Sequence, residues 1–358
     1  MLTDYLDKII CGDCLDVMAS MPESSVDSIV TDPPYGLSFM GKDWDHGVPG
    51  EAFWREALRV AKPGAHLLAF GGTRTHHRLM CAIEDAGWEI RDCLGWLYGS
   101  GFPKSLDVSK AIDKMAGAER AHEAIQWQGW GTALKPAWEP IVLARKPLIG
   151  TVAQNVLEHG TGALNIDGCR VGTEDKLSIG SNKHNGNAIN FGMKDNKEAQ
   201  SQHPQGRFPA NLIHDGSDEV EAVFPMTKSG RLGIGHGSGN SFGVGNSDKK
   251  PHPITAEYGN DAGSASRFFY CAKASSSERG EGNNHPTVKP QALMQYLCRL
   301  VTPPGGVVLD PFAGSGSTLL AALKEGFRFI GIEKEEKYCE IARRRVAEVT
   351  PSLFAPER

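Results

Sequence analysis

The sequence lacks a hydrophobic run long enough to cross a membrane, and its first residues do not form a secretory signal. A membrane-spanning helix needs about 20 consecutive apolar residues, and no segment of the 358-residue chain approaches that length. The opening stretch, MLTDYLDKIICGD, has no basic region followed by an apolar one. We therefore expect a cytoplasmic protein.

An excess of basic charge is also missing. The formal net charge is -5 and the isoelectric point is near 6.2. These values exclude a protein coated in positive charge. They do not exclude a local basic cleft, because binding of an anionic partner depends on how charge is distributed and not on its sum.

Paired cysteines at the spacing of a zinc site are absent. The eight cysteines are scattered along the chain, and only Cys11 and Cys14 form a C-x-x-C motif. No second pair stands at zinc-finger spacing, so we expect reduced thiols and no metal site.

What the sequence does contain is a regular alternation of short apolar segments with amphipathic ones. Residues 25–32 and 66–72 read as buried strands, and residues 51–65 read as an amphipathic helix that Pro63 and Gly64 end. Strand and helix alternate again from about residue 288 to the end. This pattern predicts an α/β fold with a doubly wound, mostly parallel sheet.

Glycine, with 42 residues, is concentrated in the middle of the chain. Residues 178–265 are rich in Gly, Asn, Ser and His and have no regular periodicity, which predicts long loops or disorder. Two islands, 161–172 and 207–215, have the composition of ordered segments.

The stretch IVTDPPYG, residues 29–36, places a carboxylate at the end of a buried strand. Pro33 and Pro34 cannot donate ladder hydrogen bonds, so the strand must stop at Asp32. The result is a rigid corner that carries an acid and the aromatic ring of Tyr35.

A second unit lies near the C-terminus, in VVLDPFAGSGSTLLAALKEGFRFIGIE. A strand ends at Asp310, a turn with Gly314 and Gly316 opens a helix, and the next strand ends in Glu333. Glycines at such a turn let a ligand touch the backbone, and an acid after the second strand binds ribose hydroxyls. A third glycine is missing, so a nucleoside without phosphates fits better than a dinucleotide.

In an open α/β sheet, ligands bind outside the carboxyl ends of the strands. Asp32 and Glu333 both lie at such ends. If the two units belong to one sheet, the acidic corner faces the nucleoside across one crevice.

These motifs, with the preceding NHPTVKP, resemble the S-adenosylmethionine-dependent amino-methyltransferases of DNA. The D-P-P-Y motif comes first and the cofactor glycines come last, an order similar to the β class of this family. The resemblance implies a seven-stranded, circularly permuted methyltransferase sheet with a Rossmann-like cofactor half. It implies a catalytic half at 1–150, an irregular inserted target-recognition region at 151–265, and a cofactor-binding half at 266–358.

The resemblance also implies site residues. The catalytic corner is Asp32, Pro33, Pro34 and Tyr35. The implied contacts to S-adenosylmethionine are Asp13, Asp32, Thr287, Lys289, Pro290, Asp310, Phe312, Gly314, Gly316, Ser317 and Glu333. No metal is implied.

The implied reaction is methyl transfer to an exocyclic amine of a base flipped out of double-stranded DNA. The Asp32 carboxylate and the Pro33 carbonyl accept the two amine hydrogens, and Tyr35 stacks on the base. Asp before P-P-Y favours adenine N6. Cytosine N4 methylation and an inactive DNA-binding homologue are the alternatives.

The implied setting is the cytoplasm of a bacterium, with a bacterial or phage gene. A homodimer, a cognate restriction enzyme and a solitary enzyme all remain open.

Two further groups of side chains have open interpretations. Basic residues expected to contact DNA are Arg74, Arg78, Lys104, Lys135, Arg207, Arg267 and Lys273. Trp127, Trp130 and Trp138 either pack in the core or line the pocket for the flipped base.

Overall fold

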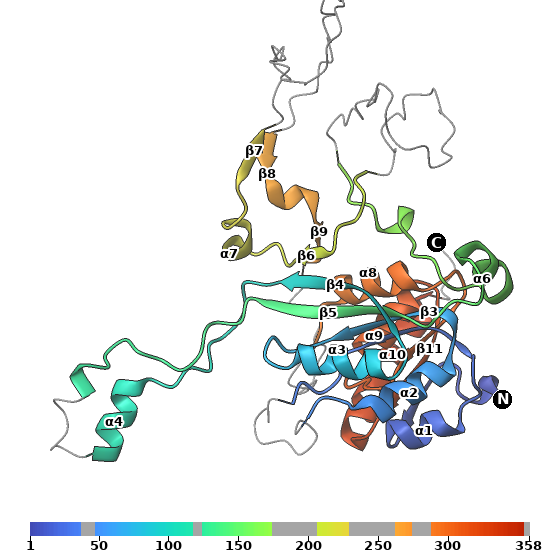
Figure 1. The fold of residues 1–358 in the computed structure, drawn as a ribbon, viewed down its shortest axis with the longest axis horizontal. Helices are drawn as coiled ribbons and strands as arrows, with labels where there is room; N and C mark the ends of the chain where they lie inside the picture. The colour runs from blue at the N-terminus through green and yellow to red at the C-terminus, as the bar shows by residue number, and fades with distance from the viewer. Residues whose placement is uncertain (37–46, 117–123, 174–205, 229–261, 274–287, 354–358) are drawn as a thin grey trace, which may run out of the picture.

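One large sheet forms the centre of the molecule. The computed structural model describes residues 1–36, 47–116, 124–173, 206–228, 262–273 and 288–353. Within them, nine strands pair in the order β1-β11-β10-β2-β3-β5-β4-β6-β9 (Figure 1). All neighbouring strands are parallel except for the two pairs that involve β5. The doubly wound, mostly parallel α/β fold that the sequence predicts is therefore confirmed.

The strands of this sheet are β1 (Lys8–Cys11), β2 (Val26–Thr31), β3 (Ala61–Phe70), β4 (Glu89–Leu97), β5 (Trp138–Arg145), β6 (Leu212–His214), β9 (Tyr270–Cys271), β10 (Val307–Asp310) and β11 (Arg328–Glu333). A separate antiparallel pair joins β7 (Met226–Lys228) to β8 (Ala262–Ser264).

The α-helices are α1 (Cys14–Ser20), α2 (Glu51–Val60), α3 (His76–Asp85), α4 (Val108–Ala116), α6 (Val152–His159), α7 (Asp218–Glu221), α8 (Gln291–Val301), α9 (Ser317–Lys324) and α10 (Glu336–Leu353). Short 3-10 turns are η1 (Leu2–Asp4), η5 (Asp167–Cys169) and η6 (Ala265–Phe268). None of the helices among the described residues is long and apolar enough to span a bilayer.

Helices cover both faces of the central strands, which explains why those strands are apolar throughout. Every residue of β2 is buried. Successive side chains of a strand point to opposite faces, so Ile29 packs in the cluster with α1, α2 and α3, whereas Val30 packs in the cluster with α8 and α9. The two clusters lie on opposite faces of one sheet. The parallel strands that contribute to both clusters end at the same edge of the sheet.

The sheet contains two strands more than the seven that the resemblance implies. Of the additional strands, β6 comes from the island 207–215 inside the Gly-rich region and β9 follows that region. β6 pairs with β4 along Gly95–Leu97. Without β6, that edge of β4 would have unpaired backbone groups. The island at 207–215 thus supplies an edge strand.

Helix α2 ends earlier than its sequence pattern predicts. We expected Pro63 and Gly64 to end it, but the chain leaves the helix after Val60, and β3 begins at Ala61. A residue that precedes proline is restricted to extended backbone. Lys62 must therefore be extended, so β3 begins before Pro63 and includes it.

Candidate functional site

A cavity of about 1320 Å³ opens at the edge where the parallel strands end. Asp32 follows β2, Asp310 ends β10, Glu333 ends β11 and Asp13 follows β1, and all four line this cavity. Carboxyl ends of parallel strands meet at one edge of a sheet. The sheet order, with β10 between β11 and β2, therefore brings the acidic corner and the glycine turn together from opposite ends of the chain.

The corner at Asp32 is held by its own tyrosine. The Tyr35 hydroxyl donates to Asp32 Oδ1 at 2.7 Å, and the Thr75 hydroxyl donates to the Tyr35 carbonyl at 2.6 Å. A Cβ at Gly72 would lie 3.2 Å from the Tyr35 ring, so the absence of a side chain there lets the ring pack against backbone. The carboxylate is consequently oriented before any ligand arrives.

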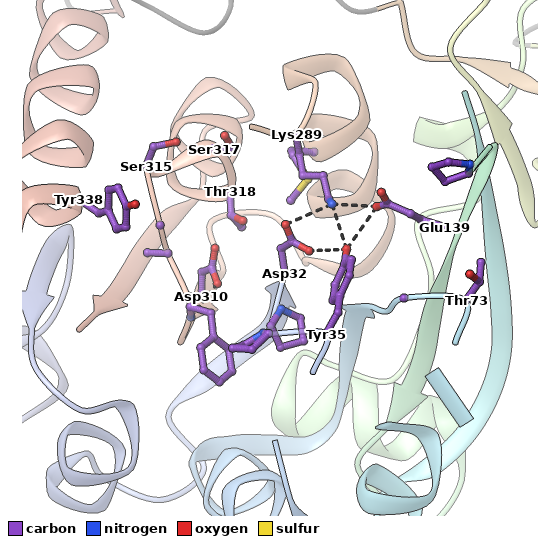
Figure 2. A pocket seen from close by; sticks show the side chains of 18 of the residues that line it. Asp32, Tyr35, Thr73, Glu139, Lys289, Asp310, Ser315, Ser317, Thr318 and Tyr338 are labelled. Carbon is purple, nitrogen blue, oxygen red and sulfur yellow. Dashed lines mark hydrogen bonds and ion pairs between the residues drawn. The ribbon is translucent and has the colours of Figure 1, made fainter. Parts of the chain in front are cut away.

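Lys289 and Glu139 complete a polar network with this corner (Figure 2). Lys289 Nζ lies 3.2 Å from Asp32 Oδ2, 2.8 Å from Glu139 Oε2 and 3.0 Å from the Tyr35 hydroxyl. Glu139 lies near the start of β5, the strand that runs antiparallel to β3. A phenol has one proton, so Tyr35 donates to the nearer acceptor, Asp32, and accepts from Lys289.

The charged side chains of this network shift the pKa values of Lys289 and Tyr35. Burial would lower the pKa of Lys289, but the carboxylates of Asp32 and Glu139 outweigh burial and raise that pKa above its usual value. Burial and the same two carboxylates hold the pKa of Tyr35 well above its ordinary range. At neutral pH Lys289 is therefore an ammonium and Tyr35 a neutral phenol.

The glycine turn presents backbone to the cavity. Gly314 and Gly316 have φ of 51° and 83°, in the left-handed region that favours glycine. The Gly314 N–H donates to Glu333 Oε2 and the Glu335 N–H donates to Glu333 Oε1, both at 2.8 Å. These bonds fix the Glu333 carboxylate at the cavity wall, and burial raises its pKa.

Asp310 lies beneath this turn with 2% of its surface exposed. Its Oδ1 accepts from the Thr31 hydroxyl at 2.7 Å and from the Phe312 N–H at 3.1 Å. Burial raises the pKa of Asp310 to about 6, although its hydrogen bonds oppose the shift. The two motifs are thus joined directly, since Thr31 stands immediately before Asp32.

Comparison with known proteins agrees with this geometry. The family model described as DNA methylase matches residues 26–344. The chain belongs to this DNA methylase family. The resemblance seen in the motifs is therefore confirmed at the level of the family.

Individual relatives of this methylase are distant. It is 22% identical over 387 residues to the Type II methyltransferase M.HindIII of Haemophilus influenzae, and the match covers 95% of each chain. The crystal structure of the M1.HpyAVI–SAM complex is 17% identical, with a TM-score of 0.43, and the match covers 94% of this chain and 98% of that one. The cytosine-N4-specific PvuII DNA methyltransferase is 15% identical, with a TM-score of 0.47, over 94% and 85% of the two chains.

Most residues that the sequence predicts for the site of the methylase line the cavity. They are Asp13, Asp32, Pro33, Pro34, Tyr35, Lys289, Asp310, Phe312, Gly314, Ser317 and Glu333. Gly316 and Pro290 do not line it. Gly316 is the N-cap of α9, and a Cβ there would point at Ala342; Pro290 is the N-cap of α8. Thr287 lies outside the described residues.

Glu139 is one of the site residues that sequence reasoning did not name. It lies in WEPIVLAR, where a single acid precedes a buried apolar strand. That acid at the strand entrance was the available signal. Its partners, Tyr35 and Lys289, are 104 and 150 residues away in the chain, so only the paired sheet reveals the contact.

The expected basic residues of the methylase divide into two groups. Arg74, Lys104 and Lys135 line the cavity. Arg78, Arg207, Arg267 and Lys273 do not. Arg267 donates to the carbonyls of Gly263 and Ser264, which makes it part of the packing around β8.

The three tryptophans of residues 127–138 do not pack in the core. Trp127, Trp130 and Trp138 are 42%, 61% and 41% exposed, so the core interpretation is wrong. Trp138 lines the cavity, whereas Trp127 and Trp130 stack edge to face with centroids 5.3 Å apart outside it. The three side chains are separated because only Trp138 belongs to the sheet.

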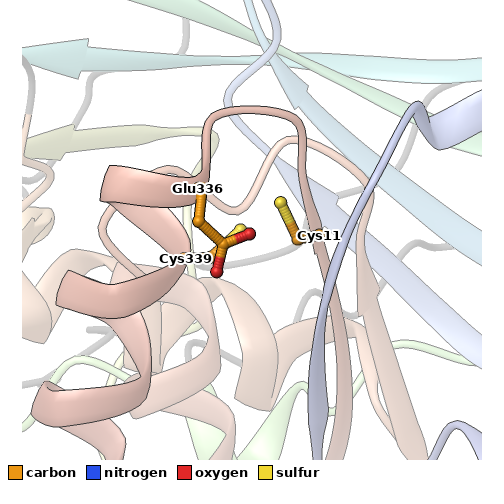
Figure 3. A group of neighbouring side chains, drawn as sticks. All are labelled: Cys11, Glu336 and Cys339. Carbon is orange, nitrogen blue, oxygen red and sulfur yellow. The ribbon is translucent and has the colours of Figure 1, made fainter.

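A second cluster of ligand-type side chains lies outside the cavity (Figure 3). Cys11, Glu336 and Cys339 place their ligand atoms within 4.8 Å of one another. Each has a partner within the protein: Glu336 pairs with Arg343 at 2.9 Å, and the two thiols donate to the carbonyls of Lys334 and Glu333. The neighbouring guanidinium disfavours a cation here, and we assign no metal to the cluster.

Proposed function

We propose that this methylase transfers a methyl group from S-adenosylmethionine to the N6 amine of adenine in double-stranded DNA, at a specific sequence. The observation that carries the proposal is the single cavity that holds both Asp32 and the turn at Gly314. A methyl donor and a methyl acceptor must meet in one pocket, and each of these motifs suits one of them. Because cellular DNA is the proposed substrate, the reaction belongs to the cytoplasm.

The residues around the glycine turn have the chemistry that a nucleoside requires. Glu333 offers carboxylate oxygens for ribose hydroxyls, and the rings of Phe312 and Tyr338 offer apolar faces on the same wall. S-adenosylmethionine, when bound, supplies a methyl group already activated on a sulfonium. The protein therefore contributes position and charge more than activation.

Asp32 prepares the acceptor amine. An exocyclic amine is a poor nucleophile because its lone pair is delocalised into the base. The Asp32 carboxylate and the Pro33 carbonyl can accept its two hydrogens and favour tetrahedral nitrogen, and the prolines fix both acceptors in advance. Tyr35 and Lys289 occupy one hydrogen-bonding direction on each Asp32 oxygen, which leaves each oxygen a second lone pair for the amine.

The test is to identify the methylated nucleoside. Purified protein is incubated with DNA and S-adenosylmethionine, the DNA is digested to nucleosides, and these are separated by mass. We expect N6-methyladenine. Detection of N4-methylcytosine would overturn the choice of base. If the intact protein produced no methylated nucleoside, the result would favour an inactive DNA-binding homologue.

The variant Asp32→Ala tests the proposed role of the Asp32 carboxylate. It is expected to lose more than about 100-fold in methyl transfer, because an oriented charge acceptor at a reacting group contributes on the order of 10²–10³ in rate. Cofactor affinity, measured by calorimetry, should change little. An Asp32→Ala protein with normal turnover would show that the corner is not catalytic.

A further inference from the structure

A projecting arm connects β4 to β5. We use "the arm" for residues 99–116 and 124–137, which leave the sheet edge together and carry α4 at their far end (Figure 1). Its two sides are joined by the Val108 N–H to the Trp130 carbonyl at 3.1 Å and by the Thr132 N–H to the Ser105 hydroxyl at 2.9 Å. Among the arm residues whose burial the structure describes, only Gly99 and Ala124 are buried, so the arm is a thin two-sided ribbon.

The root of the arm is part of the cavity wall. Its cavity-lining residues are Phe102, Lys104, Thr132, Ala133, Leu134 and Lys135, followed by Pro136 and Ala137. The two sides approach closely there, since a Cβ at Gly101 would lie 1.7 Å from the Pro136 carbonyl oxygen. Any large molecule that places a group in the cavity from this side must therefore contact the root.

The root exposes large apolar side chains next to positive charge. Phe102 is 81% and Leu134 is 91% exposed, and Lys104 and Lys135 beside them are exposed as well. No acidic residue occurs in 98–106 or 131–138. Two large apolar groups left in water forgo the stabilisation that their burial would give, so their exposure beside an entrance points to a partner that covers them.

We propose that the root of the arm holds the DNA duplex at the moment of base extrusion. Lys104 and Lys135 contact phosphates beside the target, and Phe102 and Leu134 press into the base stack next to the vacated position. This inference rests on the proposed function, because it takes the cavity as the place where the base enters. It adds a DNA-contacting element outside 151–265, the region in which the sequence predicts target recognition.

Charge and geometry favour DNA over a second copy of the chain. Lysines alternate with the apolar groups at the root, which suits a polyanion with apolar base faces beneath its phosphates. A second copy seated on the same residues would cover the opening that the base must pass. Self-association through the arm is therefore the competing outcome of the test.

The lysines are tested by the salt dependence of binding to a labelled 30-base-pair duplex of mixed sequence. Each phosphate contact contributes about 0.9 to the slope of log K against log salt. Lys104→Ala/Lys135→Ala should lower that slope by about 1.8 and weaken binding about tenfold at low salt. The matched control, Lys8→Ala/Lys324→Ala, removes two exposed lysines away from the cavity and should leave both values unchanged.

The apolar pair is tested by the extrusion of the base. Sequencing of DNA methylated by the wild-type protein identifies the target site, and 2-aminopurine then replaces the target base in a duplex. Phe102→Ala/Leu134→Ala should lose at least half of the fluorescence gain on binding while keeping the wild-type salt slope. Leu157→Ala, which removes another highly exposed leucine outside the cavity, should keep the full gain.

Calorimetric binding of S-adenosylmethionine shows that each variant is folded, and the outcomes separate the two proposals. Unchanged salt slope and unchanged fluorescence gain in root variants of an active enzyme overturn the arm proposal and leave the function intact. A root variant that changes only the elution volume of the protein identifies a self-association surface and also overturns it. Weakened DNA binding by root variants of a protein that methylates no DNA would show a DNA contact at the root, but it would refute the proposed function and, with it, base extrusion at the root.

Discussion

The side chains of Asp32, Tyr35, Glu139 and Lys289 form one network of hydrogen bonds and ion pairs in the cavity. Lys289 contacts Asp32, Glu139 and the Tyr35 hydroxyl within 3.2 Å. Its ammonium lies beside Asp32 Oδ2, one of the two carboxylate oxygens proposed to receive the target amine. The competition between Glu139 and Asp32 for Lys289 therefore decides how strongly Lys289 pairs with Asp32, the proposed acceptor of the amine hydrogens.

Glu139→Gln should change this competition. Without the charge of Glu139, Lys289 pairs with Asp32 alone and competes better with the target amine. We expect single-turnover methyl transfer to fall about tenfold, which corresponds to about 1.4 kcal/mol, while DNA affinity stays within twofold. Glu84→Gln, an exposed substitution on α3, is the control. Equal losses in rate and DNA affinity would indicate a binding role and contradict a positioning role.

Asp310 should make stability depend on pH. Its pKa rises from an ordinary 3.8 to about 6 on folding, so between these values the folded state holds a proton that the unfolded state releases. Raising the pH through this window lowers the free energy of unfolding, by about 3 kcal/mol at 1.36 kcal/mol per pKa unit. The stabilisation is complete below pH 4 and is lost above pH 6.

The variant Asp310→Asn isolates this effect, since an amide does not titrate. Urea unfolding of both proteins from pH 4 to pH 7 should show the wild type losing about 3 kcal/mol relative to the variant. A difference that stays constant across this range would mean that burial does not shift the carboxyl.

At the scale of elements, α6 is tied to β3 by one buried amide. Asn155 is fully buried, and its Nδ2 donates to the carbonyls of Pro63 and Thr161 at 2.9 and 2.8 Å. Its Oδ1 accepts from the Ile149 N–H at 2.9 Å. One side chain thus satisfies three backbone groups where the chain leaves the sheet after β5.

Asn155→Ala should therefore destabilise the protein by about 3 kcal/mol, at roughly 1 kcal/mol for each lost bond. Asn165→Ala, at an exposed asparagine that accepts from the Gly168 N–H, should cost less than about 1 kcal/mol. Urea midpoints of the two variants provide the comparison. Similar losses would show that the buried amide has no special role.

The elements differ in how far the sequence reveals them. β2 and β10 are readable because an apolar run leads into an acid followed by proline, at Asp32 and at Asp310. β11 is readable because an apolar run after Gly326 ends in Glu333. The early end of α2 was missed because Pro63 acts through the residue before it. The role of Glu139 and the path of the arm depend on pairing of β5 with β3 and β4, which no local pattern encodes.

At the scale of the whole molecule, strands from the two ends of the chain are interleaved in one sheet. Within the described part of the chain, β1 pairs only with β11, and β2 lies between β10 and β3. Strands from the first and last parts of the chain are therefore neighbours in the sheet. The same interleaving builds the cavity from both ends of the sequence. The catalytic and cofactor halves predicted at 1–150 and 266–358 share one sheet, and neither half has a complete set of strand neighbours.

A chain cut at residue 265 should consequently fail to fold in separate pieces. Fragment 1–265 lacks β10 and β11, which leaves β1 without its neighbour and exposes Ile29 of the core shared with Leu309 and Ile330. We expect this fragment to unfold without cooperativity in urea and to bind an apolar dye. Co-expression with fragment 266–358 should restore cooperative unfolding and calorimetric binding of S-adenosylmethionine, because pairing of β1 with β11 needs no covalent link at residue 265. Cooperative unfolding of 1–265 alone would mean that the first part of the chain has a core sufficient for its own stability, and that the interleaved strands are not what holds the cavity together.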